Sequence, residues 1–185
     1  MIAVVVTVTL TFAGYLATYL NGLRLAQRQE RLARVNRQLG DFYGPLLALT
    51  EANARTFAAF VERYARPGGV SPFSDGTPPT DEELAQWRLW VTAVFLPALR
   101  DMRELVVGRA DLLREPEMPP LLLESCAHAA GYEITAARWA QGDFSEHLSL
   151  VAFPGAELSG YARRGFGELK LKQARLLGGG ADGGR

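Results

Sequence analysis

Cysteine and lysine are almost missing from this chain of 185 residues. Cys126 is the single cysteine, so the chain can form neither an intramolecular disulfide nor a zinc site built from several thiolates. This composition fits a reducing compartment. Lys170 and Lys172 are the only lysines among the 20 basic residues, and such an excess of arginine is typical of a GC-rich bacterial coding sequence.

The chain also has no net charge, because 20 basic residues balance 20 acidic ones. No global field would attract nucleic acid or an acidic substrate, so the sequence predicts no nucleic-acid partner. The chain also has no alternating apolar and polar run long enough to indicate a β-strand, and no internal repeat. Because 48% of its residues are hydrophobic and 22% are charged, it should nevertheless fold. The sequence therefore predicts an all-α protein.

One long segment lacks charge entirely. Residues 2–20, IAVVVTVTLTFAGYLATYL, would rise about 28 Å as a helix, close to the hydrocarbon thickness of about 30 Å. Tyr15 and Tyr19 lie toward its end, where amphipathic rings suit a membrane interface. A secretory signal peptide would have basic residues before this run and a small-residue cleavage site after it. A buried core helix is the other, less favoured, alternative. We predict a single transmembrane anchor at residues 1–22.

Basic residues dominate the next segment, residues 23–44, which we predict to be a juxtamembrane helix. Glu30 is the only acid among five arginines spaced by three and four: Arg24, Arg28, Arg31, Arg34 and Arg37. The positive-inside rule then predicts a single-pass protein of the plasma (inner) membrane with its C-terminal domain in the cytoplasm. The arginines could also contact anionic headgroups, for about 1 kcal/mol each. An ordinary stop-transfer flank is the favoured explanation for these arginines.

An apolar seam with a spacing of three and four begins in the same segment. Its members are Leu32, Val35, Leu39, Phe42, Leu46 and Leu49, and the polar Asn53 continues it. This pattern is typical of a coiled coil, which would pair with a second copy or another protein, but it also suits packing on the chain's own later helices. Asn53 must find a partner in such a seam and could fix its register. Because Pro45 cannot donate to the carbonyl of Asp41, we expect a kink or break there.

Residues 45–177 should form a helical bundle. Its first helix should run from residue 46 to 64 and end at a loop rich in proline and glycine, residues 66–80. Thr80 and Glu83 predict a capping box, and Pro97 should interrupt the helix that follows it. A further helix should run from Pro120 to about residue 139. A second capping box at Asp143 and Glu146 predicts a short helix, residue 154 should open the last one, and residues 178–185 should be a flexible tail.

Few side chains suggest chemistry. Two carboxylate–histidine pairs at a spacing of four could together hold a metal, although the spacing is generic: Glu124 with His128, and Asp143 with His147. Cys126 lies two residues from His128, a spacing that does not bring helical side chains together, so a buried inert thiol is the better interpretation. No serine lies in a nucleophile elbow and no glycine-rich loop opens a helix. The sequence predicts no catalytic residue and no cofactor.

Four segments of the predicted domain resemble a family of small bacterial membrane-anchored proteins: NRQLGDFYGPLLALTEANARTF, WRLWVTAVFLPAL, ADLLREPEMPPLLLESCAHAAGY and GDFSEHLSLVAFPGAEL. The resemblance spans roughly residues 35–177. It implies an anchored helical architecture and no assigned activity, and it supplies no functional residue.

These observations favour a membrane-tethered cytosolic helical interaction or scaffold module. Its expected partners are the lipid bilayer and either a second copy or another membrane or cytosolic protein. One alternative is a metal-binding or enzymatic helical domain that uses the carboxylate–histidine pairs. The other is an envelope or phage-type membrane protein with an external coiled coil, against which the arginines after the anchor argue.

Overall fold

The computed structural model describes the backbone of residues 2–66 and 76–178, and the side chains of residues 10–66 and 76–178. Most of the predicted loop 66–80, the tail beyond Gly178 and the side chains of the first nine residues of the predicted anchor therefore lie outside the described residues. Throughout the described ranges the regular elements are helices and no β-strand occurs, which confirms the predicted all-α fold.

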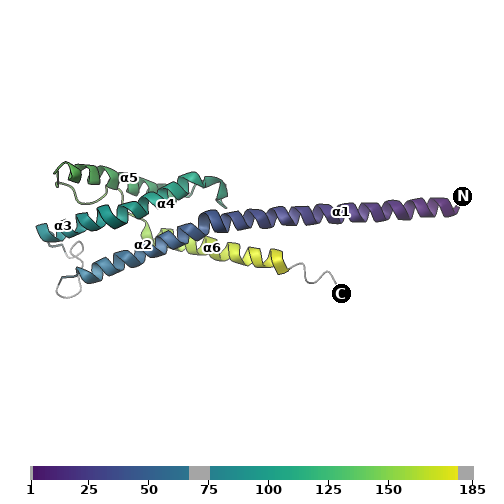
Figure 1. Cartoon of the computed structure of the whole chain (residues 1–185), viewed down its shortest axis with the longest axis horizontal. Coiled ribbons are helices and arrows are strands. Elements are labelled where there is room, and N and C mark those ends of the chain that lie inside the picture. The colour runs from purple at the N-terminus through teal and green to yellow at the C-terminus, as the bar shows by residue number, and fades with distance from the viewer. Residues whose placement is uncertain (1, 67–75, 179–185) are drawn as a thin grey trace.

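A long helical rod carries the bundle. Helix α1 (Ile2–Gln38), the π-helical turn η1 (Leu39–Tyr43) and α2 (Gly44–Arg63) follow one another without a loop. The N-terminal half of α1 projects alone beyond all other elements (Figure 1). Among the described residues, no helix is both long enough and apolar enough to cross a membrane.

The other helices fold back along the second half of this rod. They are α3 (Asp81–Trp90), the π-helical turn η2 (Val91–Phe95), α4 (Leu96–Gly108), the short 3₁₀ turn η3 (Ala110–Leu112), α5 (Pro120–Ala140) and α6 (Gly155–Gly178). Helix α6 packs against α1 and α2, while α4 lies between α2 and α5. Figure 1 shows the resulting bundle at the end of the rod opposite the N-terminus.

Both prolines predicted to interrupt helices follow a π-helical turn. The amide of Gly44, just before Pro45, donates to the carbonyl of Leu39 five residues back, and the amide of Leu96, just before Pro97, donates to Val91 in the same way. Each proline removes one donor and crowds the preceding turn, and the wider π turn accommodates this without ending the rod. The kink expected at Pro45 is therefore a π turn, and the helix resumes at once.

The predicted seam is buried within its own chain. Val35, Leu39, Phe42 and Leu46 are at most 7% exposed, and they share a core with residues of α4, α5 and α6. Leu32 and Leu49 are half-buried. Of the two arrangements that the sequence left open, the structure has the one in which the seam packs on later helices of the same chain.

Helix α3 begins with the capping box that the sequence predicts. The amide of Glu83 donates to the Thr80 hydroxyl at 3.2 Å, and the amide of Thr80 donates to the Glu83 carboxylate at 2.7 Å. Arg66 donates two further hydrogen bonds of 2.8 Å to the same carboxylate. The box thus ties the start of α3 to the chain just after α2.

This arrangement predicts acid sensitivity at the start of α3. The hydrogen bond from Arg66 and the amide of Thr80 lower the pKa of Glu83 to about 2. A carboxylate with a lowered pKa stabilises the fold above its ordinary value of 4.5 and loses that contribution as the pH falls toward 2. Thermal unfolding of the full-length protein, followed between pH 5 and pH 2, should show a smaller loss of stability in Glu83→Gln than in the wild type. Equal losses would contradict this role.

The second predicted capping box is wrong. Residues 141–154 form a loop without a helix. The Asp143 carboxylate accepts from the amide of Ser145 at 3.0 Å and from its hydroxyl at 2.7 Å. This bond to the amide two residues on closes a local turn, and because no helix follows, Glu146 has no capping position to occupy.

Candidate functional site

A cavity of about 790 Å³ lies between α2, η2, α5, the loop 141–154 and α6. Its volume falls within the range of about 300–1,000 Å³ that is usual for small-molecule sites. One wall is apolar and largely aromatic, and it is formed by Phe57, Trp87, Val91, Phe95 and Leu99. All of these residues except Phe57 belong to a second buried core of the bundle, which also contains Phe60 and Trp139.

Small residues on α6 leave this space unfilled. Gly155, Ala156, Ser159 and Gly160 line the cavity from the first turns of α6. Farther along the same helix, Leu158 and Leu169 are buried in the main core and hold α6 against the rod. Since the first turns present no large side chain between α2 and α5, close packing of the rest of α6 still leaves a void there.

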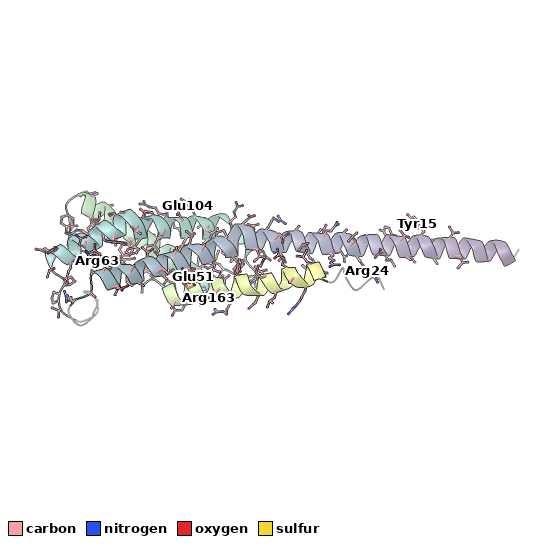
Figure 2. All side chains as sticks on the ribbon, turned by 60° about the horizontal axis from the view of Figure 1, so that its bottom comes forward. Tyr15, Arg24, Glu51, Arg63, Glu104 and Arg163 are labelled. Atoms are coloured by element: carbon pink, nitrogen blue, oxygen red, sulfur yellow. The ribbon has the colours of Figure 1, made fainter. Side chains whose placement is uncertain are left out.

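An ion pair lies at the rim of the cavity. Glu51 of α2 pairs with Arg163 of α6, whose side chain is 66% exposed. Figure 2 shows these two labelled residues close together at the place where α6 passes α2. As a solvent-exposed pair it adds little stability, but it neutralises the charge of both groups at the entrance.

Two polar acceptors belong to residues of the cavity lining. The Oδ1 atom of Asn53 is buried and accepts no hydrogen bond from the described residues. His128 contributes the other acceptor: its Nδ1 lies 2.5 Å from the carbonyl oxygen of Val151. Because that oxygen can only accept, Nδ1 carries the proton and the neutral ring keeps a lone pair on Nε2. Burial lowers the pKa of His128, and the bond to Val151 opposes this only in part, so the neutral form prevails.

Side-chain hydrogen bonds hold the loop 141–154 in place as the outer wall. Trp87 donates to the carbonyl of His147 at 2.9 Å, and Trp139 donates to that of Glu146 at 2.8 Å. The Ser149 hydroxyl donates to the carbonyl of His128 at 3.0 Å. The indoles of α3 and α5 thus satisfy two carbonyls of the loop, and a hydroxyl of the loop bonds to α5. With these bonds the loop can form a wall without regular structure.

The structure does not gather the four residues proposed as metal ligands. Glu124 is exposed whereas His128, one turn later, is buried against the cavity. Asp143 binds Ser145, and the buried Nδ1 of His147 has no hydrogen-bond partner among the described residues. Over residues 10–66 and 76–178, no three histidine, cysteine, aspartate or glutamate side chains form a group that could hold a metal ion. Burial raises the pKa of the Cys126 thiol, as expected for an unreactive cysteine.

Arg28, one of the five arginines predicted to lie at the membrane surface, bonds to the end of α6. Arg28 donates to the carbonyls of Leu176, at 2.8 Å from Nε, and of Leu177, at 3.3 Å. These carbonyls end α6, where a cation satisfies free acceptors and the helix dipole. The other four side chains, Arg24, Arg31, Arg34 and Arg37, are exposed.

The sequence indicated Asn53 and His128 separately and did not place them in one site. They are joined by a cavity whose other walls come from Phe95, from the loop 141–154 and from the small residues of α6. The run from Gly155 to Gly160 was the one signal in the sequence, because a helix facing the core seldom begins with so many small residues.

Comparison with known proteins finds no match to a family model, to a curated protein or to a solved structure. The geometry of the cavity and of the projecting helix therefore carries the functional argument.

Proposed function

We propose that this protein is a membrane-tethered helical module that works by binding, with its bundle held on a stalk below the bilayer. The observation that carries the proposal is the bare part of α1. Large apolar side chains there are 44–71% exposed although the bundle itself is well packed: Leu10, Phe12, Tyr15, Leu16, Tyr19 and Leu20. Tyr15 is labelled in Figure 2 on the part of α1 that nothing else covers. Apolar patches of this kind mark an interaction surface, and burying each large side chain in lipid contributes about 1.5–3 kcal/mol.

The uncharged run of residues 2–20 supports a lipid partner for this surface, since its length matches a bilayer. The exposed Arg24, Arg31, Arg34 and Arg37 follow immediately and favour a cytoplasmic bundle. Arg28 holds the end of α6 near the same place, so the bundle begins to thicken just below the proposed membrane surface.

The interior of the bundle supports binding more than chemistry. The histidine on the cavity lining contacts a backbone carbonyl rather than a carboxylate or a nucleophile. A general base would need a substrate proton or a nucleophile within hydrogen-bond reach and a group that orients it. An apolar cavity with a few unpaired polar groups is instead typical of a ligand site.

Charge placed in the apolar run should release the protein from membranes. Leu10→Arg with Leu16→Arg would put two arginines into the proposed span, at about 2.5–3.5 kcal/mol each. After carbonate extraction, the wild type should stay in the membrane pellet and the variant should appear in the supernatant. Leu171→Arg with Leu177→Arg is the matched control, because these leucines of α6 are also exposed, at 61% and 60%, and have the same spacing of six residues.

Release of the wild type by carbonate would refute the tether. Orientation needs its own readout, since an external bundle would also pellet. A C-terminal fluorescent-protein fusion should fluoresce and a C-terminal alkaline phosphatase fusion should be inactive. The opposite pair of results would favour the envelope or phage-type alternative.

A further inference from the structure

We propose that the cavity of about 790 Å³ binds a small, uncharged amphipathic molecule from the aqueous phase, with an aromatic or alicyclic body and one hydroxyl donor. This deepens the proposed function. Only one part of it, the aqueous source of the ligand, rests on the proposed membrane tether. The ligand class follows from three properties of the site: its apolar wall, its unpaired acceptors and its balanced charge.

The aromatic wall of the cavity determines which shape of apolar ligand it favours. Phe57, Trp87 and Phe95 present rings to the cavity, and their centroids lie 5.8–6.5 Å from one another. A flat or alicyclic body can stack against such rings and bury its whole surface there. An extended polar molecule would lose its hydration without replacement partners, and the site therefore disfavours it.

The unpaired acceptors set the polar group. Oδ1 of Asn53 and Nε2 of His128 both offer lone pairs, and the bond from Nδ1 to Val151 fixes which nitrogen of His128 is free. The buried Oδ1 of Asn53 accepts no hydrogen bond from the described residues, which costs about 1–3 kcal/mol, and a hydroxyl donor on the ligand would recover that cost. A ligand that offers only carbonyl or ether oxygens would instead face these lone pairs with its own.

The rim sets the charge. The guanidinium of Arg163 is already paired with the Glu51 carboxylate, so the two charges at the rim offset each other and leave no net charge to attract an ionised ligand. His128 is held neutral by burial. An ion inside the cavity would therefore lack a counter-charge, and a neutral molecule is favoured.

The stalk sets the source. Asn53 follows Leu20, the last residue of the apolar run, by 33 residues. At about 1.5 Å per residue along the nearly continuous rod of α1, η1 and α2, the cavity is about 50 Å from the end of that run. A lipid chain would have to leave the bilayer entirely to reach it, whereas a dissolved molecule meets the cavity directly.

The test uses three probes of one shape with the full-length protein in lipid nanodiscs. 2-Naphthol is neutral and donates, 2-methoxynaphthalene is neutral and cannot donate, and 2-naphthoate is anionic. Equilibrium dialysis measures the bound probe. The amount that partitions into lipid is measured with Ser159→Phe, whose cavity is filled, at the same lipid content, and is subtracted from the total. Ala156→Phe, on the same lining, is the second filled variant if the first does not fold.

We expect 2-naphthol to bind saturably, at one molecule per chain, and at least about tenfold more tightly than either other probe. Asn53→Leu should remove most of that advantage, and its circular dichroism should match that of the wild type. Ser125→Ala, at a buried hydroxyl of α5 that does not line the cavity, should leave the affinity unchanged.

Two results would overturn the proposal. One is equal binding of 2-naphthol and 2-methoxynaphthalene that Asn53→Leu does not alter, since the donor would then play no part. The other is no difference between the wild type and both filled variants. Failure of the tether would show separately, as loss of the protein from carbonate-washed membranes with selective binding of 2-naphthol preserved.

Discussion

Replacing Phe60 by alanine should lower the free energy of unfolding by about 3–5 kcal/mol, the range for loss of a fully buried aromatic side chain. Phe60 is 1% exposed, and its ring centroid lies 5.0 Å from that of Tyr64, 5.4 Å from Trp87 and 5.5 Å from Trp90. Alanine would remove the ring that joins α2 to α3 and leave a cavity in rigid surroundings. Denaturant unfolding of the full-length protein in one detergent, followed by tryptophan fluorescence, measures the loss.

Phe57→Ala is the matched control. Phe57 lies one turn earlier on the same helix, is 45% exposed and lines the cavity, where a void already exists. Its loss should cost about 1 kcal/mol, because little new apolar surface is exposed and no enclosed void is created. Equal effects of the two substitutions would mean that the aromatic cluster does not hold α2 and α3 together.

The helices themselves were largely predictable from local signals. Thr80 and Glu83 form a box in the sequence and in the structure, and Pro45 and Pro97 both mark an irregular turn. The similar pattern at Asp143 failed because its carboxylate accepts from the amide and hydroxyl of Ser145 in a local turn that no helix follows. Competition between a turn and a cap depends on one intervening residue, which pattern matching does not resolve.

The partner of the seam could not be predicted. A spacing of three and four says that one face of a helix is buried, but part of the covering surface comes from Leu158, Ala162 and Leu169, more than a hundred residues later. The same limit applies to the cavity. Its rim pair joins Glu51 to Arg163, and its shape depends on what α6 lacks at its start, so single residues such as Asn53 were identified without the site they belong to.

Gly165→Ala should destabilise the protein by about 1–3 kcal/mol, although alanine favours a helix more than glycine does. Gly165 lies in α6 against the ring of Tyr43, and a Cβ there would overlap that ring. Tyr43 cannot move aside: it is fully buried, its hydroxyl lies 2.9 Å from that of Tyr161, and the amide of Arg114 donates to it at 3.3 Å. The extra methyl group must therefore push α6 away from the rod.

Gly167→Ala, two residues along the same helix, should have the opposite sign. Nothing lies within 4 Å of a Cβ at Gly167, so the substitution only limits the unfolded chain and should stabilise by about 0.5–1 kcal/mol. Thermal and denaturant unfolding of both variants under identical conditions measures the difference. Stabilisation by both would mean that α6 does not press on Tyr43. The main core would then be looser than the burial of Tyr43 indicates. The cavity beside the first turns of α6 would also not depend on the contact between Gly165 and Tyr43.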